Sequence, residues 1–353
     1  MPFVSTGSAI PSCPAPIGAT GEVLLGHGSG GKLTAQLIER RILPAFQNAA
    51  LAALDDQAIV PFLGPRLAFT TDSYVVTPIF FPGGDIGELA VNGTVNDLAM
   101  GGAAPLYLSL AFILEEGFPL ADLDRVIASI RRSAERAGVA IVTGDTKVVD
   151  RGKGDKIFIN TAGVGIPMQG TRLGSSEVKP GDAILLSGTI GDHGVAILSV
   201  REGLELEGDV RSDTAPLHGL TKAMLAASRD IHAMRDPTRG GLAATLVEIA
   251  SRRRLGIEVD EASIPMRDGV KGACEILGLD PLLLANEGKL VAFVPEESAG
   301  RVLEAMRRDP LGRDAARIGR VTAERPGTVV LSTRLGRERI VDLPAGAQLP
   351  RIC

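Results

Sequence analysis

The sequence contains no tryptophan, only two tyrosines and only three cysteines among its 353 residues. So few aromatic side chains, together with a net charge of −5, argue against the stacking platforms and basic surfaces with which proteins bind nucleic acids. Cys13, Cys274 and Cys353 are an odd, widely spaced set, which is typical of a reducing compartment and excludes a zinc site built from CxxC pairs. Because there is no basic leader and no apolar run long enough to cross a bilayer, we expect a cytoplasmic protein without membrane contact.

The apolar content is sufficient for two domains, since 45% of the residues are hydrophobic. Strand-like and helix-like stretches alternate, which predicts an α/β (α+β) fold. The clearest helix covers 121–137, where apolar residues recur at helical spacing and Gly138 follows as a stop. A polar, turn-rich stretch at 168–182 separates two halves. The predicted segments are a disordered extension (1–21), an N-terminal domain (22–167), a C-terminal domain (175–342) and a flexible tail (343–353).

The glycine-rich stretch GHGSGGKL, residues 26–33, partly fits two nucleotide-binding templates. Leu33 stands where a Walker loop needs a hydroxyl group for Mg²⁺, and the apolar stretch before the glycines is too short for the strand of a dinucleotide fold. The glycines still allow backbone N–H groups to approach an anion. Two interpretations remain, a flexible turn or a phosphate contact made by Gly28, Gly30, Gly31 and Lys32.

Three aspartates stand beside Gly, Thr or Asn at predicted strand ends: Asp72, Asp97 and Asp145. Mg²⁺ prefers oxygen ligands, and it commonly takes a few carboxylates together with the phosphates of a substrate. If the three segments converge, the aspartates form such a site. Each aspartate alone is equally typical of a turn or a helix cap.

Other polar groups accompany these aspartates. Lys147 lies two residues after Asp145, so a regular strand would place both on one face, where the lysine could neutralise phosphate charge. Glu287 in ANEGK precedes an apolar strand and is a candidate general base. Asp236 in DPTRGG lies near a predicted helix start, where anions bind well. A surface lysine, a loop carboxylate and a simple helix cap are the alternative interpretations.

The chain ends in PRIC, so Cys353 is its last residue. A thiol on an extended tail is a mobile nucleophile, and about nine residues can reach roughly 30 Å. Such a cysteine could be loaded at one site and moved to another. The alternative is a C-terminal cysteine without a function.

These segments together resemble one family. The chain carries, in order, HGSGGK, TTDSYVV, FFPGGDIGELAVNGTVNDLAM, VTGDTKVV, NTAGVG, SGTIGDHG, RDPTRGG, ANEGKL and the terminal PRIC. This set is similar to the HypE hydrogenase maturation factors, which are carbamoyl dehydratases of the aminoimidazole-ribotide-synthetase-like (PurM-like) superfamily. The resemblance covers about residues 22–353, and other members of the superfamily lack the PRIC tail.

The resemblance implies two PurM-like domains, with a mostly antiparallel N-terminal sheet that pairs with its copy in a homodimer. It implies that ATP binds between the halves with Mg²⁺. A carbamoyltransferase, HypF, would load a carbamoyl group on the terminal cysteine, and ATP would drive its dehydration to a thiocyanate. The cyanide would pass to iron on a HypC–HypD complex during assembly of the NiFe hydrogenase centre.

The resemblance also implies roles for residues. Cys353 would carry the substrate, Lys147 would steady negative charge at the γ-phosphate, and Glu287 would take the N–H proton. The Mg²⁺ and nucleotide contacts would be Asp72, Asp97 and Asp145, with Asn96, Thr146, Asp236 and the glycine-rich segment.

Two other functions remain open at this stage. An ATP-dependent small-molecule enzyme of the same superfamily, such as an aminoimidazole ribotide synthetase or a thiamine-phosphate kinase, would not need Cys353. A non-catalytic carrier would present its loaded tail to partner enzymes without turning over ATP.

Overall fold

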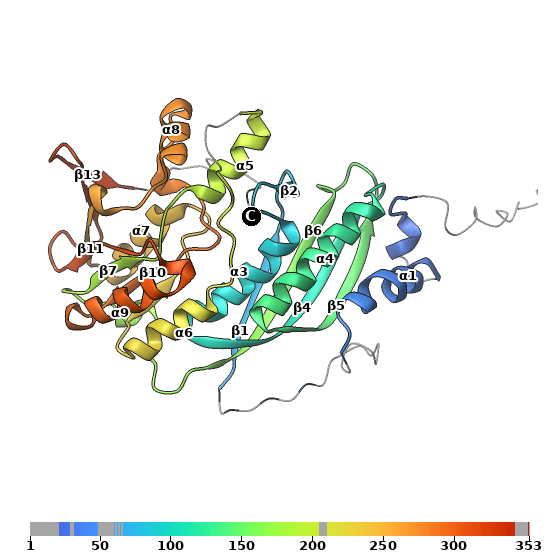
Figure 1. Cartoon of the computed structure of the whole chain (residues 1–353), viewed down its shortest axis with the longest axis horizontal. Helices are drawn as coiled ribbons and strands as arrows, with labels where there is room; N and C mark the ends of the chain where they lie inside the picture. The colour runs from blue at the N-terminus through green and yellow to red at the C-terminus, as the bar shows by residue number, and fades with distance from the viewer. Residues whose placement is uncertain are drawn as a thin grey trace, which may run out of the picture.

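The computed structural model describes residues 21–28, 32–48, 60, 62, 64, 66–204, 210–342 and 352 (Figure 1). Two sheets form the two halves of the molecule, and the helices pack against them. The predicted α/β (α+β) class is therefore confirmed. Among the described residues, every helix is too short or too polar to span a membrane.

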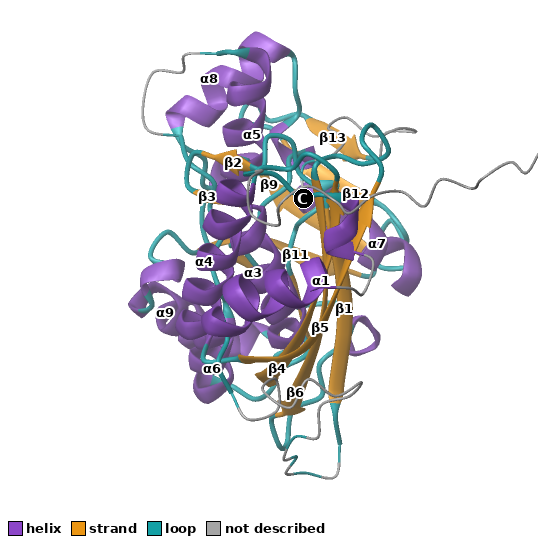
Figure 2. Ribbon diagram, turned by 90° about the vertical axis from the view of Figure 1, so that its right-hand side faces the viewer, coloured by secondary structure: helices purple, strands orange, loops and turns teal. Residues whose placement is uncertain are grey.

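The N-terminal sheet has four strands in the order β1-β6-β4-β5. Its strands are β1 (Ala68–Tyr74), β4 (Ala103–Glu115), β5 (Ala140–Val149) and β6 (Ile157–Pro167). All neighbouring pairs are antiparallel except β4 and β5, which are parallel. Helices α3 (Ile86–Met100) and α4 (Leu120–Ala137) lie on one face of this sheet (Figure 2).

Local sequence explains both helices. On α4 the apolar positions form one buried stripe, and Gly138 ends the helix at a φ of 66°, a conformation that glycine adopts without strain. On α3 the Asp85 carboxylate accepts hydrogen bonds from the backbone N–H groups of Gly87 and Glu88 and so caps the first turn. Almost every residue of α3 is buried, because the helix packs between the N-terminal sheet and the second half.

The second half is a seven-stranded sheet in the order β13-β12-β9-β11-β7-β10-β8. Its strands are β7 (Ala183–Leu186), β8 (Ala233–Arg235), β9 (Gly256–Asp260), β10 (Val291–Val294), β11 (Ala316–Thr322), β12 (Val329–Ser332) and β13 (Glu338–Val341). The remaining elements include α1 (Lys32–Leu37), β2 (Phe80–Phe81), β3 (Gly84–Asp85), α5 (Asp192–Glu202), α6 (His218–Ala227), α7 (Gly241–Arg253), α8 (Asp268–Leu277) and α9 (Glu296–Arg308). Alternate residues of β7 join two different apolar clusters, so helices cover both faces of this sheet.

The two faces of the N-terminal sheet differ. Side chains directed at α3 and α4 form a continuous buried core. On the other face Phe69 is 66% exposed and Ile113 is 43% exposed. This uncovered face determines where some of the predicted site residues lie.

Candidate active site

Two of the predicted aspartates meet at the contact between β1 and α3. Asp97 on α3 accepts a hydrogen bond from Thr70 Oγ1 at 2.7 Å, and Asp72 on β1 accepts one from Tyr74 Oη at 2.9 Å. A Cβ atom at Gly93 of α3 would lie 2.2 Å from the Tyr74 hydroxyl oxygen, so only glycine leaves room for this arrangement. The pKa of Asp97 is raised by burial and by the charge of Asp72, although the Thr70 hydrogen bond opposes the shift.

Asp236 and Glu287 complete an acidic cluster with Asp72 and Asp97. Asp236 lies between β8 and α7, and its pKa is raised to about 7 by burial and by the neighbouring charges of Asp97 and Asp72. Four carboxyl groups from four separate segments thus come together where the two halves meet. Burial first, and then the charges of neighbouring carboxylates, raise the pKa values of Asp97, Asp236 and Glu287, and a bound cation would offset this repulsion.

Glu287 is the most deeply buried member of this acidic cluster, at 3% exposure. Burial, followed by the charges of Asp213, Asp236 and Asp72, raises its pKa well above the usual range for a glutamate. Its Oε1 atom is buried without a hydrogen-bond partner among the described residues. A buried, proton-holding carboxyl group with a free oxygen is suited to exchange a proton with a bound substrate.

Asn96 is a positioning residue in this structure. Its side-chain nitrogen donates to the carbonyl oxygens of Ala215 and Glu287, at 3.0 and 3.3 Å, and its oxygen accepts from the Leu217 N–H at 2.7 Å. These backbone contacts tie α3 to the second half and hold the Glu287 loop. Both side-chain N–H groups of Asn96 are engaged in these contacts, and its predicted contact with a nucleotide stays a prediction.

Asp145 and Lys147 lie apart from the acidic cluster, on β5, at the opposite edge of the N-terminal sheet from β1. Side chains alternate between the faces of a strand, and Asp72 points toward the helices. On β5 it is Thr146 that is buried, while Asp145 and Lys147 are 63% and 64% exposed on the uncovered face and form an ion pair at 3.5 Å. The expected convergence of Asp72, Asp97 and Asp145 therefore does not occur within one chain.

Part of the glycine-rich stretch also belongs to the β5 side. Leu25–Gly28 forms a 3-10 turn that contacts β5, and Lys32 begins α1. Gly30 and Gly31, and the side chain of Lys32, lie outside the described residues, as does Cys353. The phosphate contact proposed for this stretch thus stays a prediction.

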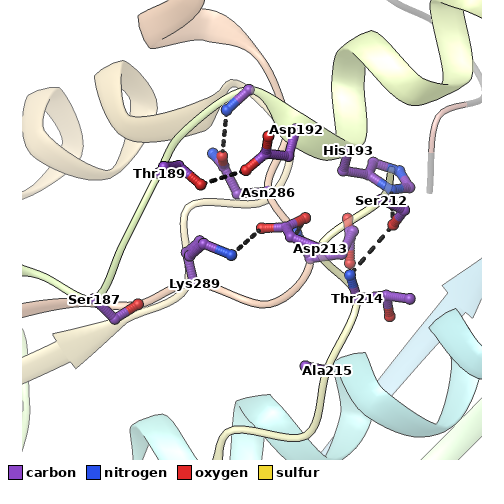
Figure 3. Close-up of polar contacts among 12 residues, drawn as sticks. Ser187, Thr189, Asp192, His193, Ser212, Asp213, Thr214, Ala215, Asn286 and Lys289 are labelled. Carbon is purple, nitrogen blue, oxygen red and sulfur yellow. Dashed lines mark hydrogen bonds and ion pairs between the residues drawn. The ribbon is translucent and has the colours of Figure 1, made fainter. Parts of the chain in front are cut away.

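A second polar cluster adjoins Glu287 (Figure 3). Asp213 and Lys289 form a buried ion pair, with Nζ and Oδ2 3.1 Å apart, and Figure 3 shows the lysine pointing at the carboxylate. Asp213 Oδ1 also accepts a hydrogen bond from the Glu287 N–H at 3.0 Å. Burial alone would raise the pKa of Asp213, but Lys289 and this N–H outweigh it, so the pKa is lowered and the carboxylate stays charged.

Ile352, next to the last residue of the chain, reaches this second polar cluster. It is only 5% exposed, and its carbonyl oxygen lies 2.7 Å from His193 Nε2. His193 is completely buried at the start of α5, and its Nδ1 atom lies 2.8 Å from Ser212 Oγ. The other residues of the tail, 343–351 and Cys353, lie outside the described residues.

Asp213, Lys289 and His193 were not predicted as site residues from the sequence. His193 and Lys289 lie in SGTIGDHG and ANEGKL, two of the segments that carry the family resemblance. Their place in these segments could have indicated that they belong to the site. Asp213 lies in a stretch without a motif, so only its contact with Lys289 identifies it.

Comparison with known proteins matches residues 54–167 to the N-terminal domain, and 179–332 to the C-terminal domain, of AIR synthase related proteins. The chain is 55% identical over 333 residues to Carbamoyl dehydratase HypE of Azotobacter vinelandii, covering 94% of this chain and 98% of that protein. A crystal structure of HypE in complex with ATP has a TM-score of 0.90 at 51% identity, covering 94% of this chain and 99% of that chain. A structure of a HypE–HypF complex has a TM-score of 0.77 at 47% identity, covering 87% and 99% of the two chains.

Proposed function

Because this chain belongs to the carbamoyl dehydratase HypE family of AIR synthase related proteins, we propose that it dehydrates a carbamoyl group carried on Cys353, using ATP. The product is a thiocyanate that supplies the cyanide ligand of iron during NiFe-hydrogenase maturation. The observation that supports this most directly is the burial of Ile352, the residue joined to Cys353, beside the loop that holds Glu287.

The reaction has two steps, phosphorylation of the carbamoyl oxygen and then elimination of phosphate. The oxygen of Cys–S–CO–NH₂ attacks the γ-phosphorus of ATP, so ADP leaves and one N–H proton is lost. The remaining N–H proton and the phosphate then leave, and the C≡N bond forms. Phosphorylation is needed because the amide oxygen is a poor leaving group, whereas phosphate leaves readily.

Glu287 takes a proton from the nitrogen in this scheme. Its pKa is raised well above the usual range by burial and by neighbouring carboxylates, so the side chain holds a proton until positive charge reaches the acidic cluster. The carboxylate that forms is then a strong base beside the reacting nitrogen. Mg²⁺ bound beside Asp72, Asp97 and Asp236 would favour loss of the resting proton of Glu287 to solvent, so the base would form when the nucleotide's metal ion is in place.

The residues present fit Mg²⁺ carried by ATP. Asp72, Asp97 and Asp236 would supply oxygen ligands and negative charge to the metal ion. Within the described ranges, no group of three or more acidic, histidine or cysteine side chains is arranged to hold a metal ion by itself. Phosphate oxygens and water would therefore complete the coordination, as is usual for Mg²⁺ in ATP-using enzymes.

A homodimer would bring Lys147 of one copy to the acidic cluster of the other copy. If Lys147 acts on the same phosphate as Glu287, it cannot come from the same chain, because it lies on the uncovered face at the far edge of the N-terminal sheet. Pairing of that face with its copy would bury Phe69 and Ile113 and bring Asp145, Lys147 and the glycine-rich stretch of one copy toward the acidic cluster of the other.

The partners follow from the same proposal. A carbamoyltransferase of the HypF type loads Cys353, in keeping with the solved HypE–HypF complex of a relative. A HypC–HypD complex then receives the cyanide, in the cytoplasm. The two domains that carry out these steps are residues 22–167 and 175–342.

Intact-protein mass spectrometry tests the function. The chain is incubated with the carbamoyltransferase and carbamoyl phosphate, then separately with Mg–ATP. We expect Cys353 to gain one carbamoyl group and then to lose one water only when ATP is present. Glu287→Gln should load normally but keep the water, and the matched control Glu297→Gln, an exposed glutamate of α9, should behave as the wild type.

Two outcomes would contradict the proposal. Loading without ATP-dependent loss of water would indicate a carrier. Absence of loading, with ATP turnover unchanged in Cys353→Ala, would indicate a small-molecule enzyme of the same superfamily.

A further inference from the structure

The end of the tail is held by a histidine that the proposed chemistry does not use. His193 Nε2 lies 2.7 Å from the Ile352 carbonyl oxygen, and both residues are buried. A carbonyl oxygen can only accept a hydrogen bond, so Nε2 must carry the proton and donate it. This contact involves the backbone of the residue that precedes Cys353.

The second ring nitrogen of His193 is also engaged. Nδ1 lies 2.8 Å from Ser212 Oγ, and Ser212 Oγ accepts a hydrogen bond from the Thr214 N–H at 3.2 Å. The serine hydroxyl therefore donates to Nδ1, which selects the neutral ring with its proton on Nε2. Complete burial lowers the pKa of His193 and favours the same neutral form, although the Ile352 carbonyl opposes the shift.

The ring is also fixed in orientation. Phe81 packs edge-on against it, with ring centroids 5.5 Å apart and an angle of 87° between the planes. The preceding turn is held by Asn286, whose side-chain oxygen accepts from the Gly191 N–H at 2.7 Å. These contacts come from both halves of the molecule, so His193 can point at the tail only when the halves are assembled.

The Ile352 side chain supplies a second attachment. It belongs to the buried apolar cluster of the N-terminal half, to which Ile197 of α5 and Ala285 also belong. Burial of an isoleucine side chain is favourable and independent of the hydrogen bond made by its carbonyl group. The tail end is thus held by one polar contact and one apolar contact.

The same short loop positions the tail and the base. Ser212 orients His193, and the next residue, Asp213, accepts a hydrogen bond from the Glu287 N–H at 3.0 Å. Resting on the function proposed above, we infer that His193 and the buried apolar cluster around Ile352 form a latch, which fixes Ile352 and so positions the adjoining Cys353 for the reaction with Glu287. His193 is a positioning residue here.

Alkylation of Cys353 tests the latch without ATP or any partner. The full chain is treated with iodoacetamide, and modification of Cys353 is followed by peptide mass spectrometry. Loss of a buried hydrogen bond or of a buried side chain should raise the alkylation rate about tenfold in His193→Ala and in Ile352→Ser. His193→Gln keeps a neutral N–H donor and should restore slow alkylation, and Ile340→Ser, at a 67% exposed isoleucine, is the matched control.

A second readout separates the latch from the catalytic machinery. In single-turnover dehydration of carbamoyl-loaded protein, His193→Ala should lower the rate about tenfold while the KM for ATP is unchanged. If His193→Ala does not fold, Ile352→Ser gives the same test from the tail itself.

The outcomes distinguish this inference from the proposed function. Alkylation at the wild-type rate in both His193→Ala and Ile352→Ser overturns the latch, whatever the chain catalyses. Fast alkylation in these variants supports the latch, even if the wild type does not dehydrate its carbamoyl group, in which case the proposed function fails alone.

Discussion

Replacing Asp236 with asparagine should stabilise the folded chain, and the gain should grow as the pH rises. The pKa of Asp236 in the folded protein is about 7, compared with an ordinary value of 3.8. The folded state therefore holds a proton that the unfolded chain loses above pH 3.8, so ionisation destabilises the fold progressively until the pH passes about 7. Asparagine removes this penalty because it cannot ionise.

The magnitude follows from the separation of the two pKa values. About 3 pKa units correspond to about 4 kcal/mol at pH 8, whereas at pH 5 only about 1 unit, or about 1.5 kcal/mol, has been lost. The Asp236 side chain is half-buried, and solvent screening should reduce both values by about half. We expect the unfolding temperature of Asp236→Asn to exceed that of the wild type by about 3–6 °C at pH 8 and by about 1–2 °C at pH 5.

Thermal unfolding between pH 5 and 8, without Mg²⁺ or ATP, measures this difference. Asp230→Asn, at an exposed aspartate in the segment before β8, is the matched control and should follow the wild type. A parallel pH dependence of Asp236→Asn and the wild type would refute the reasoning, because it would mean that Asp236 ionises as an isolated carboxyl group does. A difference in unfolding temperature that is the same at every pH would show that the substitution changes packing around residue 236 and not ionisation.

Mg–ATP provides a second check on the same variant. A bound cation should offset the repulsion among Asp72, Asp97 and Asp236, so Mg–ATP should stabilise the wild type more at pH 8 than at pH 5. In Asp236→Asn that extra stabilisation at pH 8 should be absent. Equal stabilisation of both proteins would place the cation elsewhere.

Mixing the inactive variants Lys147→Met and Glu287→Gln should restore about a quarter of wild-type dehydration. Half of the dimers are then heterodimers, and each heterodimer holds one intact site of its two. If verified heterodimers show no activity, Lys147 and Glu287 act in one site of the same chain. Lys289→Met should lower the free energy of unfolding in urea by about 3–5 kcal/mol, because Asp213 is left charged and buried, and the double variant with Asp213→Asn should recover most of the loss. Gly93→Ala should cost about 1–3 kcal/mol in the same assay, since the added Cβ would lie 2.2 Å from the Tyr74 hydroxyl oxygen; a stability equal to the wild type would show that Tyr74 moves freely.

Helices with regularly spaced apolar residues on one face were predictable from the sequence. The helix expected at 121–137 is α4, at Leu120–Ala137, whose apolar residues recur at helical spacing on one buried face. Helix α5 was not predicted, because its first seven residues are all buried and it therefore lacks the apolar stripe that periodicity detects. The short strands β8, β9 and β13 were also missed, since three to five residues carry too little alternation.

The candidate site was predictable only in part. Asp72, Asp97, Asp236 and Glu287 were selected from local motifs, and they do form one acidic cluster. Asp145 was grouped with Asp72 because their motifs are similar. A local motif does not determine which edge strand, or which face of the sheet, carries the side chain, and Asp145 lies on the edge strand opposite β1.

The sequence alone determined the fold class, the order of the motifs, the strong helix α4 and the terminal Cys353, because these depend on residue identity and short-range periodicity. Tertiary structure decided which charges meet. The pairing of Asp213 with Lys289, the burial of Ile352 against His193, and the separation of Lys147 from Glu287 each join or divide segments far apart in the chain. Such contacts depend on strand order, on the face to which a side chain points, and on the packing of α3 between the two halves, which no local pattern records.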